Sequence, residues 1–101
     1  MALLKHVILD VLKPHQPTIL ELANALAVAV PACTIHIHVE EVDDKTESVT
    51  LVVDGDDIPY ETVVKTIADM GASVHSIDEV DVTGDGYDGY DGPPRTPATS
   101  S

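Results

Sequence analysis

The 101-residue sequence has one cysteine, no phenylalanine or tryptophan and three tyrosines. A lone cysteine excludes an intrachain disulfide, a Cys-x-x-Cys redox or metal site and an iron–sulfur cluster. Cys33 is therefore expected to be a buried structural thiol. Because two of the tyrosines, Tyr87 and Tyr90, lie close to the C-terminus, the chain lacks the aromatic rings that an RNA-stacking sheet requires.

Basic side chains are also scarce: five Lys and Arg face 18 Asp and Glu, which gives a formal net charge of −13. This charge repels phosphate backbones and anionic lipids, so we expect no nucleic-acid and no membrane partner. No apolar run approaches the ~20 residues of a membrane span, and no secretory signal pattern opens the chain, so a cytoplasmic location is expected. The acidic, lysine-poor composition resembles that of proteins from halophilic archaea, because molar salt screens such self-repulsion.

Apolar periodicity predicts six secondary-structure elements within residues 1–82. Period-two alternation predicts strands over residues 3–12, 34–42, around 49–53, and over 72–82. Helical spacing predicts one helix that starts near Thr18, through a capping box or with Pro17 as its first residue, and a second helix from Pro59 to Gly71. Residues 13–17 contain two prolines and are expected to leave the strand. Residues 83–101 are expected to be a disordered acidic tail rich in Gly, Pro and Ser.

The order strand, helix, strand, strand, helix, strand predicts an α+β, ferredoxin-like βαββαβ sandwich. Its four-stranded antiparallel sheet carries both helices on one face. The opposite face is expected to be free, with polar side chains projecting from it: His6, Asp10, His36, His38 and Glu40.

Two stretches, Leu-Asp-Val-Leu-Lys-Pro-His-Gln-Pro at 9–17 and His-Ser-Ile-Asp-Glu-Val at 75–80, resemble the signatures of an archaeal family catalogued as domain of unknown function number 211. The resemblance covers residues 3 to 82. It implies a ferredoxin-like fold, ring-shaped homo-oligomers, divalent-cation binding and no assigned reaction. The family pattern does not include His36 and His38, and it points to six other positions: Asp10, Lys13, His15, His75, Asp78 and Glu79.

A candidate metal site combines His36 and His38 with Asp10 and His75. The two histidines lie about 7 Å apart on one strand face, where they can share a metal or reach a neighbouring subunit. The end of the first strand should approach the start of the fourth, which would let Asp10 and His75 form a hydrogen-bonded pair. These four residues are the predicted ligands of a divalent cation, calcium or a transition metal, and the competing interpretation is that the histidines are ordinary outward-facing polar residues.

Other charged residues give weaker indications. Asp78 and Glu79 are adjacent in a strand and are expected to point to opposite faces. Residues 81–86 imitate the opening of a calcium-binding loop, but Gly92 stands where the last ligand is needed. His6 and His15 are interpreted as surface or loop residues without a role of their own.

The leading functional hypothesis is a non-enzymatic, homo-oligomeric binding or scaffold protein, ring-forming as the family resemblance implies, that holds a divalent cation. The alternative is a small-ligand-sensing regulatory domain of the same topology, and sequence alone leaves both open. An acylphosphatase-like enzyme needs an arginine in the loop after the first strand, whereas the only arginine here is Arg95. We therefore expect no enzymatic activity.

Overall fold

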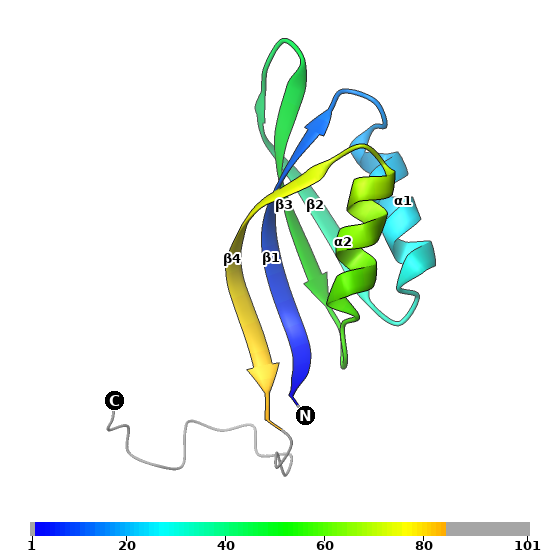
Figure 1. The fold of residues 1–101 in the computed structure, drawn as a ribbon, viewed down its shortest axis with the longest axis vertical. Helices are drawn as coiled ribbons and strands as arrows, with labels where there is room; N and C mark the ends of the chain where they lie inside the picture. Colours follow the sequence, from blue (N-terminus) through cyan, green and yellow to red (C-terminus); the bar gives the residue numbers. More distant parts are fainter. Residues whose placement is uncertain (1, 85–101) are drawn as a thin grey trace, which may run out of the picture.

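The computed structural model describes residues 2–84 and has the predicted βαββαβ order (Figure 1). The elements are β1 (Leu3–Pro14), α1 (Ile19–Ala29), β2 (Thr34–Val42), β3 (Thr46–Asp54), α2 (Tyr60–Asp69) and β4 (Ser73–Thr83). No helix among these residues is long and apolar enough to cross a membrane.

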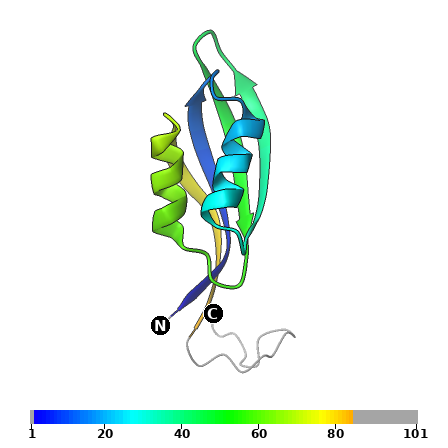
Figure 2. The ribbon, with the colours of Figure 1, turned by 90° about the vertical axis from the view of Figure 1, so that its right-hand side faces the viewer.

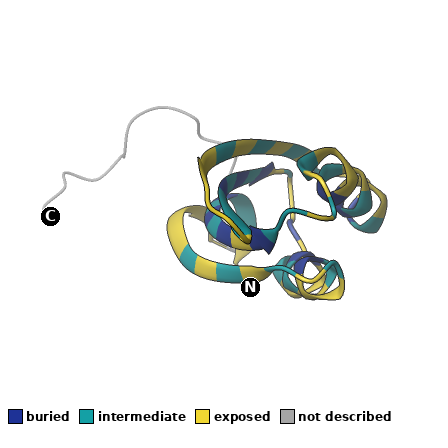
Figure 3. Cartoon of the chain, turned by 90° about the horizontal axis from the view of Figure 1, so that it is seen from above, coloured by how far each residue is buried: buried dark blue, intermediate teal, exposed yellow. Residues whose placement is uncertain are grey.

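The four strands form one antiparallel sheet in the order β2-β3-β1-β4. β1 and β3 are therefore central, and β2 and β4 are the edges. Both helices cover the same face of this sheet, as the views in Figures 2 and 3 show. The ferredoxin-like fold predicted from the sequence is thus confirmed. Neither α1 nor α2 lies on the second sheet face, which is called here the open face.

The core lies between the helices and the inward side chains of the central strands. Val7, Leu9 and Val11 alternate along β1, and all three are fully buried. Burying a side chain of this size contributes roughly 1.5–3 kcal/mol to folding. The core is completed by buried residues of β3, the helices and their flanks: Val49, Leu51, Val53, Leu22, Leu26, Val30, Ile58, Val63 and Ile67.

Local signals fix the helix ends. The Thr18 hydroxyl accepts a hydrogen bond from the Glu21 amide (3.2 Å), and the Glu21 carboxylate accepts one from the Thr18 amide (2.8 Å). This reciprocal capping box decides between the two predicted starts of α1. α2 follows Pro59, and Gly71 after its end has φ +83°, a conformation that favours glycine.

β1 continues further than predicted, because Lys13 pairs with Glu47 and Pro14 with Thr46. The expectation that the prolines would end the strand before residue 13 was wrong. Pairing of β1 with β4 stops at Leu12, so Pro14 has a strand neighbour on one side only. At such a local edge the missing proline N–H removes no ladder hydrogen bond.

The pairing of β1 with β4 is interrupted by three register shifts, between Leu4 and His6, Ile8 and Leu9, and Asp10 and Val11. By contrast, β1 pairs with β3 without interruption from His6 to Pro14. β4 ends at Thr83, one residue into the segment predicted as a tail. Residues 85–101, which include most of the predicted tail and the last two residues of the calcium-loop-like stretch 81–86, lie outside the described residues.

Candidate functional site

Strand register arranges the open face in three rows that cross the sheet from β2 to β4. Cross-strand partners lie on the same side of a sheet, so each row shares one surface. The rows are Thr34, Asp54, His6 and Asp81; then His36, Val52, Ile8 and Glu79; then His38, Thr50, Asp10 and Ser76.

The four predicted metal ligands do not meet within one chain. His36 and His38 are exposed on the edge strand β2, and Asp10 is separated from them by β3, about 9.6 Å across the sheet. Asp10 lies opposite Ser76, because a register shift moves His75 out of the pairing. Among residues 2–84, no group of three or more His, Cys, Asp or Glu side chains is arranged to hold a metal ion.

His38 has a closer acidic neighbour on its own strand. Its Nε2 lies 3.8 Å from Glu40 Oε2, and the same carboxylate oxygen accepts a hydrogen bond from the Thr50 hydroxyl at 3.0 Å. Both histidine side chains of β2 point away from the helices, as the alternation predicted. Any shared ligand would therefore have to approach this edge from outside the chain.

His6 lies on the open face, as predicted, but between two carboxylates that the sequence pattern did not connect with it. Its Nδ1 donates to Asp54 Oδ1 (2.5 Å) and its Nε2 donates to Glu79 Oε2 (2.8 Å), and its side chain is 19% exposed. The hydrogen bond to Asp54 and then that to Glu79 raise the pKa of His6 above its ordinary value. Because these partners are 48 and 73 residues away in the sequence, only the strand register could have revealed this cluster.

A second ionic cluster joins β1 to the β2–β3 hairpin. Lys13, whose side chain is 1% exposed, donates to Pro14 O (2.7 Å) and to Glu47 Oε1 (3.1 Å). His15 donates from Nδ1 to Glu47 Oε2 (3.2 Å) and from Nε2 to Asp44 O (2.9 Å). Hydrogen bonds from His15 and then Lys13 lower the pKa of Glu47, and the bond to Glu47 raises the pKa of His15. This cluster explains structurally two of the motif positions, Lys13 and His15, without a ligand.

Asp78 and Glu79 were expected on opposite faces, and this prediction was wrong. Glu79 pairs with Ile8 and reaches His6 on the open face, while Asp78 accepts a hydrogen bond from Ser76, another open-face residue, at 2.8 Å. The register shift between Ile8 and Leu9 leaves Asp78 as an extra residue in β4. Such a bulge breaks the alternation of side chains on which the prediction depended.

The helix-side face of β4 exposes three apolar side chains, Ile77, Val80 and Val82, called here the β4 apolar surface. Their exposures are 54%, 52% and 55%. Ile77 and Val80 pair with the buried Leu9 and Val7, and Val82 pairs with Leu4, which packs against the core. Figure 1 shows that the C-terminal half of β4 runs beside β1 past the two helices, so neither α1 nor α2 covers this part of the strand.

Two hydrophobic positions on α1 are also exposed, Leu20 (68%) and Val28 (81%). They are two helical turns apart with Asn24 between them. Isolated exposed apolar residues of this kind are common on folded proteins. The β4 apolar surface differs because its members are neighbours on an edge strand.

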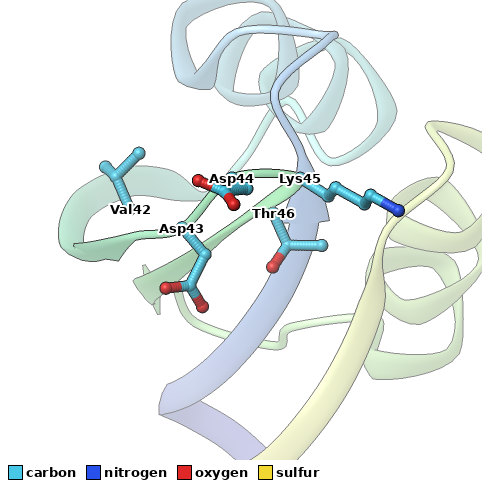
Figure 4. Close-up of a pocket in the computed structure, with 5 residues that line it drawn as sticks. All are labelled: Val42, Asp43, Asp44, Lys45 and Thr46. Carbon is cyan, nitrogen blue, oxygen red and sulfur yellow. The ribbon is translucent and has the colours of Figure 1, made fainter.

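A surface pocket lies at the turn of the β2–β3 hairpin, lined by Val42, Asp43, Asp44, Lys45 and Thr46. In Figure 4 the Lys45 side chain extends away from the two aspartates. All residues that line this pocket come from one turn. The Asp44 carbonyl oxygen already accepts a hydrogen bond from His15. A further pocket is lined by Ala2 and residues 59–62, and neither pocket includes a predicted metal ligand.

Cys33 is partly buried and packs against the core, as expected for a structural thiol. Burial raises the pKa of the Cys33 thiol above its ordinary value. A thiol held in its protonated form is a poor nucleophile and a poor metal ligand.

Comparison with known proteins agrees with the signature stretches. Residues 5–86 match the model of the family DUF211, described as uncharacterised ArCR. The chain is also similar to an uncharacterised protein of Methanocaldococcus jannaschii, MJ0319, with 34% identity over 77 residues, which are 76% of this chain and 79% of that protein. The chain therefore belongs to the DUF211 family.

Proposed function

We propose that this protein is a non-enzymatic, homo-oligomeric scaffold whose copies associate through the β4 apolar surface. The observation that carries the proposal is that Ile77, Val80 and Val82 stand on the core side of the sheet and yet are about half exposed. A second copy laid on this surface would complete the core that the helices leave uncovered. An edge strand also offers unpaired backbone N–H and C=O groups to a neighbour.

Charge favours this surface over the rest of the molecule. Two copies that each carry −13 repel one another, so a stable contact needs a patch without acidic side chains. Asp78 and Glu79 engage residues of the open face, which leaves the helix-side face of β4 apolar. Removing half of three aliphatic side chains from water is worth about 1 kcal/mol each.

Subunit number depends on what the β4 apolar surface meets. A contact with the same surface of a second copy produces a dimer, whereas a contact with a different surface, such as the β2 edge, repeats head to tail and can close a ring. Molar mass measured by light scattering over a range of protein concentrations distinguishes these outcomes. A monomeric mass at every concentration in molar salt would contradict the proposal.

We propose that the acidic surface is an adaptation to a salt-rich cytoplasm. The net charge of −13 makes both the fold and the assembly depend on screening, which weakens as salt falls from molar to millimolar concentration. Oligomers should dissociate, or the melting temperature should fall, over that range. An unchanged molar mass and melting temperature over that range would contradict the proposed adaptation to salt.

A divalent cation, if the assembly holds one, would lie between subunits. His36 and His38 are exposed on the β2 edge, where donors of a neighbouring copy can approach them, whereas Asp10 and His75 on the same chain are beyond reach. Calcium and zinc added separately to the metal-free protein should raise its melting temperature if they bind. The double variant His36→Ala/His38→Ala should lose the response, and an equal response would exclude both residues from the site.

The open face favours a second candidate function, small-ligand sensing. Ile8 and Val52 form a half-buried apolar centre between His36 and Glu79 in one row of the sheet. An apolar centre with polar groups at its margins is the composition of a small-molecule site. Selective stabilisation by an amino acid in a thermal-shift screen, without any response to cations, would favour this alternative.

A further inference from the structure

Both ring nitrogens of His6 face carboxylate oxygens, Asp54 Oδ1 and Glu79 Oε2. An ionised carboxylate only accepts hydrogen bonds, and a neutral imidazole has only one N–H. Both contacts can be hydrogen bonds only when both ring nitrogens carry protons. In this geometry His6 is therefore an imidazolium cation, and its two hydrogen bonds link β1 to β3 and to β4.

Three carboxylates surround this single cation. Asp54 lies opposite His6 on β3, Asp81 lies opposite it on β4, and Glu79 lies one row further along β4. Lys5, the next residue along β1, lies 4.0 Å from Asp56, so this cation already has a carboxylate beside it. Loss of the His6 proton leaves Asp54, Glu79 and Asp81 close together, and none of the salt bridges within residues 2–84 then gives them a counter-charge. Their mutual repulsion acts across the β1–β4 pairing.

Two of these residues flank Val80 along β4, although their side chains lie on the other face of the sheet. Between two register shifts, β1 and β4 share a short segment of three consecutive pairs, His6 with Asp81, Val7 with Val80, and Ile8 with Glu79. Val80, at the centre of the β4 apolar surface, belongs to the middle pair. The hydrogen bond from His6 to Glu79 therefore spans the segment that holds Val80 in place.

We propose that His6 is a protonation switch for self-association: its imidazolium holds the C-terminal half of β4 in the conformation that presents Val80, and loss of the proton releases Glu79 and weakens the contact between copies. This inference rests on the proposed function, because it concerns regulation of the same surface. The charged groups that face His6 are Asp54 from β3 and Glu79 and Asp81 from β4.

The sign of the pH effect follows from the direction of the shift. The pKa of His6 is raised in the folded protein above its ordinary value, mainly by the hydrogen bond to Asp54. The hydrogen bonds of His6 therefore stabilise the folded protein fully below about pH 6.5, where His6 is protonated in the unfolded chain as well. This stabilisation is lost as the pH rises through the higher pKa that His6 has in the folded protein. Assembly should therefore weaken as the pH rises through the folded pKa of His6.

Sedimentation velocity of the full chain in molar salt with a chelator, at about pH 6 and about pH 8.5, tests the switch. We expect the dissociation constant of the wild type to be about tenfold higher at the higher pH, which corresponds to about 1.4 kcal/mol of association free energy. The variant His6→Gln, which cannot become a cation, should associate weakly at both pH values and show no transition. The variant His6→Lys, which remains a cation, should stay associated at both.

The variant Lys65→Gln is the matched control, because it removes one positive charge from the exposed face of α2. It should keep the wild-type pH dependence. If wild type and His6→Gln associate equally at both pH values, the switch is wrong while the proposed assembly stands. If Lys65→Gln reproduces His6→Gln, net charge rather than the His6 bridge controls association, and the inference is overturned.

A monomeric mass at every pH would refute the proposed assembly and, with it, the control of assembly by His6. Whether the His6 proton holds β4 in place is then tested by a second measurement. Amide hydrogen exchange of residues 79–82, expressed as protection factors, then reports whether His6 holds β4. We expect protection to fall by about pH 8.5 in the wild type and to be low at both pH values in His6→Gln. Equal protection in the two proteins at both pH values would exclude the switch.

Discussion

Replacing Val80 by threonine tests the β4 apolar surface with little disturbance of the fold. Threonine keeps the β-branched shape that suits a strand and exchanges one methyl group for a hydroxyl. Val80 is 52% exposed in the single chain, so the hydroxyl can remain in water in the monomer. In the assembled protein the same hydroxyl would be buried against a second copy.

The expected effect can be estimated from the exposed half of the side chain. The methyl group that is lost contributes about 0.8 kcal/mol to the contact, and burial of a hydroxyl without a hydrogen-bond partner costs a further 1 kcal/mol or more. A loss of about 2 kcal/mol corresponds to a dissociation constant about 30-fold higher. Sedimentation velocity over a concentration series measures this change directly.

Val28→Thr is the matched control, because Val28 is 81% exposed on α1 and lies outside the β4 apolar surface. The control should dissociate like the wild type and have a similar melting temperature. An unchanged dissociation constant for Val80→Thr would show that Val80 is not part of the contact. Equal losses in Val80→Thr and Val28→Thr would show that the effect is not specific to the β4 apolar surface.

Three further predictions concern the fold. A Cβ at Gly55 would lie 2.9 Å from Cys33 Sγ, so Gly55→Ala should lower stability by about 1–3 kcal/mol in urea unfolding, and Cys33→Ala should relieve most of that loss in the double variant. Gly71 has φ +83°, and a Cβ added there would meet no atom within 4 Å. Gly71→Ala should therefore lower the free energy of unfolding by about 1–2 kcal/mol through backbone strain alone, and Cys33→Ala should not relieve this loss. The pKa of Glu47 is lowered in the folded protein. Its ion pairs therefore stabilise the fold fully at pH values above the ordinary pKa of a glutamate, and this stabilisation is lost as the pH falls through the folded pKa. Glu47→Gln should therefore melt at a lower temperature than the wild type near neutral pH and lose less on acidification, and parallel melting curves from about pH 6 to pH 3 would contradict this.

Most of the fold could be predicted from the sequence because local patterns and core packing agree. The alternation of Val7, Leu9 and Val11 fixed the inward face of β1, and Thr18 with Glu21 marked the start of α1. The end of β1 was mispredicted because the tolerance of a strand for Pro14 depends on whether a neighbour pairs on both sides. That information belongs to the sheet and not to the segment.

The candidate site was predicted less well, because it depends on register between distant strands. A β-bulge shifts side chains by one position, and the bulges of β4 placed Ser76 opposite Asp10 and brought Asp78 and Glu79 to the same face. The partners of His6 come from β3 and β4, so its own surroundings in the sequence contain no sign of the cluster. The predictions that used period two alone therefore failed where the ladder is irregular.

Association along β4 is best tested by amide hydrogen exchange of residues 77–82 in the native chain, at protein concentrations below and above the dissociation constant. If copies meet along β4, these amides should be slow to exchange only in the concentrated sample, while the amides of α1 exchange at the same rate in both. Exchange along β4 that does not change between a monomeric and an assembled sample would place the contact elsewhere and contradict the central claim.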